Sequence, residues 1–228
     1  MKDLKDKVWH LLQNNDGRYE SIGSATAIKI TDDRFLLISA EHVMEQKNIC
    51  VPCKESFSEN PKYELLLGQR VASKSEDWSC LILNKELFEK FCEGGYSHSI
   101  VGKADGVYTF AGFPISKNKT RKTMVQNRPY SYTGTEISKE LYNSYKLDSS
   151  KYIGVCYDSK NTIDSNTGEP TQFPDPHGMS GGGIFNSKKE LVGVITDQSE
   201  DGKIFWGIRI SYILNSAVTS QITLSKTL

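Results

Sequence analysis

The stretch Gly178-Met179-Ser180-Gly181-Gly182-Gly183 places one serine among four glycines, directly before an apolar run. A serine hydroxyl is a weak nucleophile until a base removes its proton. Neighbouring glycines leave backbone N–H groups free to face a developing oxyanion, and each such donor contributes roughly 3–4 kcal/mol. The stretch therefore predicts acyl-transfer chemistry, with Ser180 as nucleophile and the N–H groups of Gly178 and Ser180 as the oxyanion hole. Taken alone, it is also typical of a structural turn.

Two further segments supply the partners that a serine nucleophile needs. Ser39-Ala40-Glu41-His42-Val43 follows an apolar run, and Asp77-Trp78-Ser79-Cys80-Leu81 opens another. An imidazole has a pKa suited to accepting the serine proton near neutral pH. A carboxylate beside it fixes the tautomer and stabilises the imidazolium. We therefore predict His42 as general base and acid, and Asp77 as the residue that orients it.

Around these segments the sequence alternates between short β-type runs and turn residues, which is typical of an all-β barrel or sandwich. Similar numbers of runs lie on either side of Gly94-Gly95. We therefore predict a first β-barrel over residues 16–95 and a second over residues 96–228. Apolar residues spaced as on a helix predict an N-terminal helix within residues 1–15, and Ser211 to Val218 are predicted to form a C-terminal helix.

In this order, the His, Asp and Ser motifs resemble the trypsin/chymotrypsin-like serine proteases, and most closely the HtrA-like bacterial branch without a PDZ domain. The resemblance spans about residues 20–218 and rests on six stretches: Gly23–Ile28, Ser39–Val43, Asp77–Leu81, Val107–Pro114, Gly178–Gly182 and Leu191–Val194. It implies two tandem six-stranded antiparallel β-barrels of the chymotrypsin-like kind, with the triad in the cleft between them. It also implies a serine endopeptidase that acts on protein substrates through an acyl-enzyme, without a cofactor.

The resemblance also implies where a substrate binds. The segment Phe173–His177 corresponds to the wall of the primary specificity pocket, and Pro174 occupies the position of the acid that selects basic residues in trypsin. Asp175 follows one residue later, so a preference for Lys or Arg and a preference for small or apolar residues both stay open. Phe205 or Trp206 is expected to close the far wall. The predicted substrate-binding residues are Asp175, His177 and Thr196.

Regulation is expected to differ from that of the secreted relatives. Met179 stands where the secreted digestive members carry the Asp that pairs with a new amino terminus, and no Ile-Val-Gly-Gly start is present. We therefore expect no zymogen switch of that kind. Control is expected from narrow specificity, from the polar segment Asp158 to His177, or from a regulatory protein partner. Some small family members accompany bacterial stress or anti-phage systems, and we hypothesise the same setting for this chain.

Composition narrows the class of protein. The 228 residues hold 28 Lys and Arg against 28 Asp and Glu, so the formal net charge is zero. This balance argues against a general nucleic-acid or anionic-membrane binder. The hydrophobic share of 37% and charged share of 25% are typical of a soluble globular protein. Five cysteines, an odd number, and the lack of a signal-peptide or membrane-spanning pattern predict a reducing, cytoplasmic setting.

A cysteine pair and a basic run are two further motifs that could form a metal site or a nucleic-acid site. Cys50-Val51-Pro52-Cys53 is a single Cys-x-x-Cys pair, and a zinc site needs about four ligands. Lys117 to Lys122 holds four basic residues in six, but lacks the interleaved aromatic residues of a nucleic-acid site. We therefore predict no metal and no nucleic acid, and we interpret the basic run as a solvated hairpin or a contact for an acidic partner.

Two alternatives to a protease remain. The first is a binding module that keeps the protease fold with little or no activity. The second is an esterase-type acyl hydrolase, whose nucleophile motif is Gly-x-Ser-x-Gly and whose triad runs Ser, Asp, His along the chain. The reverse order of His42, Asp77 and Ser180 argues against the second alternative. Against the first, the chain retains all three catalytic residue types.

Overall fold

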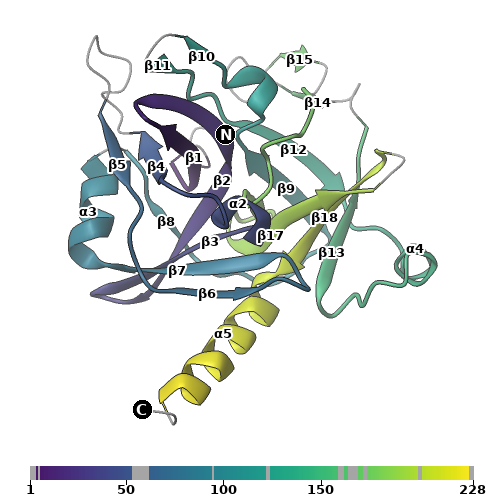
Figure 1. The fold of residues 1–228 in the computed structure, drawn as a ribbon. Helices are drawn as coiled ribbons and strands as arrows, with labels where there is room; N and C mark the ends of the chain where they lie inside the picture. The colour runs from purple at the N-terminus through teal and green to yellow at the C-terminus, as the bar shows by residue number, and fades with distance from the viewer. Residues whose placement is uncertain are drawn as a thin grey trace.

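A computed structural model describes residues 4, 6–52, 62–93, 95–121, 124–158, 162–163, 169–171, 174–199 and 202–225. The fold is mostly β, with two main sheets and few helices (Figure 1). It confirms the predicted all-β class. The first main sheet contains eight strands rather than the six expected for the first barrel, and the second contains six.

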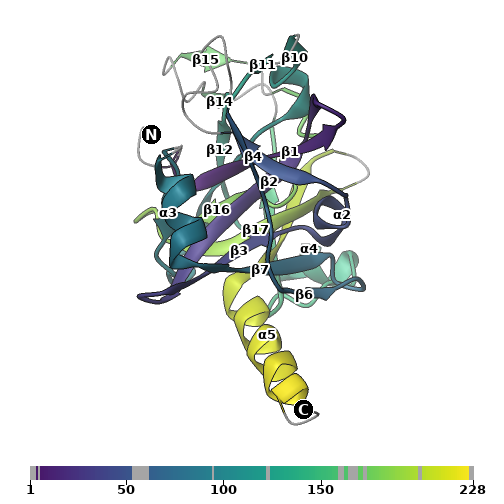
Figure 2. The same cartoon turned by 60° about the vertical axis from the view of Figure 1, so that its left-hand side comes forward.

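The first sheet has the order β5-β4-β1-β2-β3-β7-β6, and β8 pairs in parallel with β2. Its strands are β1 (Val8–Asn15), β2 (Arg18–Thr31), β3 (Arg34–Ser39), β4 (Ile49–Pro52), β5 (Tyr63–Leu65), β6 (Arg70–Ser73), β7 (Trp78–Asn84) and β8 (His98–Ser99). The sheet therefore begins at residue 8 and extends by one short strand beyond the predicted boundary at residue 95. Figure 2 shows how strongly its strands curl.

The second sheet has the order β12-β9-β16-β17-β18-β13. Its strands are β9 (Val107–Gly112), β12 (Tyr130–Thr135), β13 (Tyr152–Cys156), β16 (Gly183–Phe185), β17 (Leu191–Gln198) and β18 (Ile204–Arg209). An isolated antiparallel bridge between Glu136 and Val155 joins the chain just after β12 to the edge strand β13, so the sheet curls round on itself. Tight packing inside it comes from aromatic residues such as Phe110, Tyr132 and Phe205.

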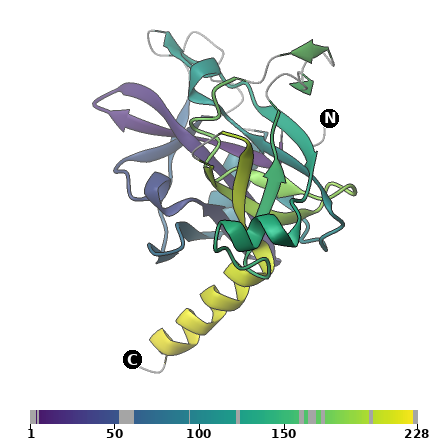
Figure 3. The same ribbon diagram turned by 90° about the vertical axis from the view of Figure 1, so that its right-hand side faces the viewer.

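The remaining elements are short, with one exception. They are α2 (Glu41–Met44), α3 (Lys85–Glu93), the 3-10 turn η2 (Ile115–Lys117), α4 (Lys139–Ser144), α5 (Ile210–Ser225) and the strand pairs β10 (Thr120–Arg121) with β11 (Met124–Val125) and β14 (Thr162–Ile163) with β15 (Pro170–Thr171). The predicted C-terminal helix is present as α5, which continues past its predicted end. Figure 3 shows α5 leading away from the two barrels.

The predicted N-terminal helix is wrong over residues 8–15, which form β1. Asp16 and Gly17 both have positive φ, 53° and 88°, as a two-residue type I′ hairpin requires, and they join β1 to β2. Apolar spacing misled the prediction because both faces of β1 are covered: every residue from 8 to 12 is fully buried, including the polar His10. Residues 1–3 and 5 of that prediction lie outside the described part of the chain.

The two sheets pack against each other through a shared apolar cluster. Val8, Ile38 and Trp78 of the first sheet meet Phe185 and Val194 of the second in this cluster, and the start of α5 closes it. Burial of apolar side chains on this scale is the main favourable term in folding. The interface therefore holds the ends of β3 and β7 at a defined position relative to the loop before β16.

Candidate active site

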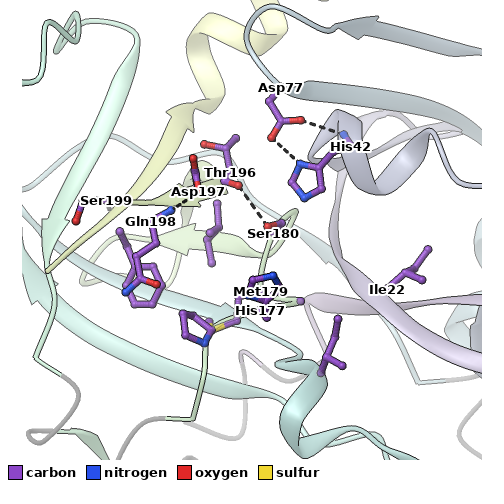
Figure 4. Close-up of a pocket in the computed structure, with 15 residues that line it drawn as sticks. Ile22, His42, Asp77, His177, Met179, Ser180, Thr196, Asp197, Gln198 and Ser199 are labelled. Carbon is purple, nitrogen blue, oxygen red and sulfur yellow. Dashed lines mark hydrogen bonds and ion pairs between the residues drawn. The ribbon is translucent and has the colours of Figure 1, made fainter. Parts of the chain in front are cut away.

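Three segments far apart in sequence meet at the boundary between the sheets. His42 lies on α2 directly after β3, Asp77 ends the turn between β6 and β7, and Ser180 lies in the loop before β16. All three line one cleft of about 510 Å³ (Figure 4). The structure thus brings together the three residues that the sequence predicted as a triad.

His42 and Asp77 are joined by two hydrogen bonds. The imidazole Nδ1 lies 2.8 Å from Asp77 Oδ2, and the backbone N–H of His42 donates to Asp77 Oδ1 at 3.0 Å. A carboxylate can only accept, so Nδ1 is the donor and the proton-free nitrogen is Nε2. Asp77 therefore fixes both the tautomer and the ring orientation that a general base needs.

The carboxylate also changes the acidity of the imidazole. The hydrogen bond from His42 to Asp77 raises the pKa of His42 above its ordinary value of 6.5, while partial burial opposes this change. The negative charges of Asp77, Asp197 and Glu45 raise the pKa further. Asp77 thus favours the protonated imidazole, the form that His42 takes when it accepts a proton.

A partly buried group of hydrogen bonds, centred on Glu76, holds the turn that carries Asp77. Glu76 accepts hydrogen bonds from Tyr212 Oη at 2.6 Å and from Trp78 Nε1 at 3.0 Å, and it pairs with Lys151. Partial burial opposes ionisation, but these donors prevail and lower the pKa of Glu76 to about 2. Because Lys151 and Tyr212 belong to the second half of the chain, these contacts connect the Asp77 turn to the part of the structure that carries Ser180.

One side of the predicted oxyanion hole is set by the peptide that joins His177 to Gly178. The His177 carbonyl accepts a hydrogen bond from the Ile115 N–H at 2.7 Å, so the Gly178 N–H of the same trans peptide points the opposite way. Gly178 has φ +92°, and a Cβ on it would lie 2.6 Å from Ile115 Cγ1 and 2.8 Å from the Phe113 carbonyl. Only glycine fits this conformation and this space.

The other side is set by the peptide that joins Met179 to Ser180. The Met179 carbonyl accepts from the Gly182 N–H at 2.8 Å, which turns the Ser180 N–H in the opposite direction. Neither the Gly178 nor the Ser180 N–H donates to a protein acceptor among the described residues. Both donors are thus available, as an oxyanion hole requires.

The Ser180 hydroxyl is turned toward β17 in this structure. It donates to the Thr196 carbonyl at 3.3 Å, and no hydrogen bond joins Ser180 to His42 (Figure 4). Rotation of the side chain is therefore needed before Ser180 can give its proton to His42. Such looser contacts are usual for catalytic groups in the absence of substrate.

The predicted substrate-binding residues have different outcomes. Thr196 lines the cleft and is buried, and His177 lines its rim. Asp175 is not among the residues that line the cleft. Its side chain is 66% exposed, and its Oδ1 accepts from the backbone N–H of His177 at 3.0 Å. The prediction that Asp175 contacts substrate is therefore not supported by its position.

Apolar side chains also line the cleft, and of the two residues expected at the far wall Phe205 is among them and Trp206 is not. Met179, Ile195 and Phe205 line it and are at most 2% exposed. The Phe205 ring packs against Tyr157, with 4.5 Å between ring centroids, which holds it in place. Ile22 and Ile115 also line the cleft. No motif in the sequence marks Ile22, Ile115 or Ile195 as part of the site, because many other apolar residues of the chain have similar neighbours.

Other motifs carry no site in the described part of the chain. Cys50 is buried and unpaired, and its partner Cys53 lies outside the described residues. No group of three or more potential metal ligands occurs among the described residues. Lys117 and Lys119 of the basic run are exposed, at and just after η2. Within the described residues, no helix combines the length and hydropathy needed to cross a membrane.

Comparison with solved structures finds clear similarities, whereas comparison of the sequence with protein-family models and curated proteins finds no match. A serine endoprotease from Yersinia pestis superposes with a TM-score of 0.57 at 14% identity, covering 96% of this chain and 64% of the other. Neuropsin, a serine protease expressed in the limbic system of mouse brain, has a TM-score of 0.59 at 13% identity, covering 96% and 95%. The present chain thus spans less than two thirds of the Yersinia protein's length.

Proposed function

The chain has a trypsin/chymotrypsin-like double-barrel fold, and within it we propose a serine endopeptidase that cleaves protein substrates through an acyl-enzyme. One observation carries the proposal: His42 donates to Asp77 at 2.8 Å in the same cleft that holds Ser180. The free N–H groups of Gly178 and Ser180 support it further. The more specific resemblance to the HtrA-like branch stays a prediction.

In the proposed mechanism, His42 Nε2 takes the Ser180 hydroxyl proton while Oγ attacks the substrate carbonyl carbon. The carbonyl oxygen gains negative charge and receives hydrogen bonds from the N–H groups of Gly178 and Ser180. His42 then gives its proton to the leaving amine as the C–N bond breaks. Water, activated in the same way, attacks the acyl-enzyme and releases Ser180. Asp77 stays ionised throughout and stabilises the imidazolium.

The residues that line the cleft support a preference for small or apolar substrate residues at the cleavage site. Met179, Ile195 and Phe205 give the cleft an apolar lining. Of the two described carboxylates that line it, Asp77 is engaged by His42 and Asp197 is exposed. A buried Lys or Arg side chain would lack a buried counterion, which is costly. Proteome-wide mapping of new termini, made by the wild type and not by Ser180→Ala, should show cleavage after small or apolar residues. Cleavage mainly after Lys or Arg would contradict this preference.

The pH dependence of the reaction follows from the direction of the His42 shift. The base must be neutral, so kcat/KM should fall about tenfold per pH unit below the His42 pKa, which Asp77 raises above 6.5. The acid limb of the profile should therefore have its midpoint above 6.5. Glu45→Gln removes one exposed negative charge and should lower that midpoint slightly. An acid limb centred below 6.5 would contradict the expected effect of Asp77 on the His42 pKa.

A second candidate function, a binding module with the protease fold, is favoured by one contact. The Ser180 hydroxyl donates to the Thr196 carbonyl rather than to His42, and a binding module has no need to transfer that proton. Reaction with a fluorophosphonate separates the two functions, because the probe modifies only an activated serine. Labelling of the wild type at Ser180 supports the endopeptidase, and absence of labelling in the folded protein supports the binding module.

We further propose a cytoplasmic, reducing setting and control by narrow specificity or by a protein partner. Cys92 and Cys156 are exposed and unpaired, and the two cysteines buried in the described region are also unpaired. Free exposed thiols persist best where disulfides are kept reduced. An association with a bacterial stress or anti-phage system stays a prediction.

A further inference from the structure

Ser24 on β2 makes an unusual set of contacts for a buried serine of the first sheet. It is fully buried and forms four hydrogen bonds outside its strand pairing, three of them with Phe113, Gly178 and Ser180. Its N–H donates to the Ser180 carbonyl at 2.9 Å, and its hydroxyl donates to the Gly178 carbonyl at 2.9 Å. The same hydroxyl accepts from the Phe113 N–H at 2.8 Å.

These bonds act on the loop that carries the two oxyanion donors. The two donor N–H groups belong to the peptides 177–178 and 179–180. The Gly178 carbonyl belongs to the peptide between them, 178–179, and the Ser180 carbonyl belongs to the next peptide, 180–181. With the bonds from Ile115 and Gly182 described above, every carbonyl from residue 177 to 180 accepts a hydrogen bond. No carbonyl of this loop is left to turn into the cleft and fill the oxyanion hole.

The backbone of Ser24 has neighbours of its own in the first sheet. The Ser24 carbonyl accepts from the Ser39 hydroxyl at 2.7 Å, and Ser39 ends the strand that leads into His42. Gly181, with φ +85°, lies against the same two residues, since a Cβ on it would be 2.0 Å from both the Ser24 carbonyl and Ser39 Oγ. Ser39 therefore contacts the Ser24 backbone from the first sheet, whereas only Ser24 forms hydrogen bonds with the carbonyls of the Ser180 loop.

We propose that Ser24 is a positioning residue that holds the oxyanion hole in its competent form from the opposite barrel. This inference rests on the proposed endopeptidase function. Removal of the hydroxyl leaves the Gly178 carbonyl and the Phe113 N–H buried without a hydrogen-bond partner. This is energetically costly, so we expect the loop to rearrange. A shift of about 1 Å in such a site can reduce the rate about 100-fold. The effect should fall on the transition state, because the hole contacts charge that develops only there.

The test compares Ser24→Ala with Ser39→Ala. Both variants remove one hydroxyl from a fully buried serine, but only the Ser24 hydroxyl bonds to the nucleophile loop. We expect Ser24→Ala to lower kcat about 10- to 100-fold with little change in KM, and Ser39→Ala to keep kcat within a few-fold of the wild type. Affinity for a peptide boronic acid, which mimics the tetrahedral intermediate, should fall in parallel with kcat. Binding of the uncleaved peptide, measured in the Ser180→Ala background, should stay unchanged.

Further variants separate positioning from stability. Ser24→Thr keeps the hydroxyl and should restore most of kcat, and Ser24→Cys, with a weaker donor, should give an intermediate rate if Ser24→Ala does not fold. A folded Ser24→Ala with wild-type kcat, or equal losses of kcat in Ser24→Ala and Ser39→Ala, overturns the proposal. If the folded wild type neither reacts with a fluorophosphonate nor hydrolyses peptides, the endopeptidase proposal fails and this inference falls with it.

Discussion

Ser180→Ala is expected to lower kcat for a peptide substrate about 10⁶-fold, the scale seen when a triad nucleophile is removed. The variant lacks the oxygen that forms the acyl-enzyme, whereas the oxyanion donors and the cleft remain. Its affinity for an uncleaved peptide should therefore stay close to that of the wild type. The substitution deletes one 3.3 Å hydrogen bond to the Thr196 carbonyl, so thermal unfolding should shift by only a few degrees.

The measurement combines peptide hydrolysis with fluorophosphonate labelling, followed by mass spectrometry of the modified peptide. Ser116→Ala is a matched control, because Ser116 is an exposed serine on η2 and does not line the cleft. The control should be labelled and should hydrolyse substrate at the wild-type rate. Residual hydrolysis above about a thousandth of the wild-type rate in pure Ser180→Ala would show that another residue is the nucleophile.

Asp77→Asn is expected to reduce kcat about 10⁴-fold, as in other enzymes where the orienting carboxylate becomes an amide. Asp77 accepts from both the Nδ1 and the backbone N–H of His42. An amide can also donate, which permits the tautomer that places the proton on Nε2 and leaves no base facing Ser180. Loss of the carboxylate also removes the main cause of the raised His42 pKa, so that pKa should fall.

Both consequences of Asp77→Asn can be measured independently of the substrate. Titration of the His42 ring signals by NMR reports the pKa directly, and the rate of fluorophosphonate labelling reports activation of Ser180. Asp197→Asn is the matched control, because Asp197 also raises the His42 pKa but makes no hydrogen bond to the ring. A wild-type labelling rate in Asp77→Asn would show that Asp77 is not part of the triad.

Prediction from sequence was most specific where one local stretch carries the information. The Gly-x-Ser-Gly-Gly stretch, the Ala-x-His-Val stretch and the Asp that opens an apolar strand each identify a residue by its immediate neighbours. The all-β class followed from short runs and turns. The helix predicted at the N-terminus failed for a physical reason: β1 is covered on both faces, so its sequence lacks the alternation that marks a strand. Asp16-Gly17 was the signal that could have corrected it.

The sequence by itself determined the fold class and the identity of the three candidate catalytic residues, because each depends on a short motif whose chemistry is local. Only the tertiary structure decided that Asp175 lies off the cleft, that Glu76 clasps the Asp77 turn, and that Ser24 supports the Ser180 loop. The hydrogen bond from Ser24 to Gly178 joins residues 154 positions apart. Such a contact exists only once the two barrels have packed. Apolar burial at their interface brings the two groups together, and no sequence pattern near either residue predicts the contact.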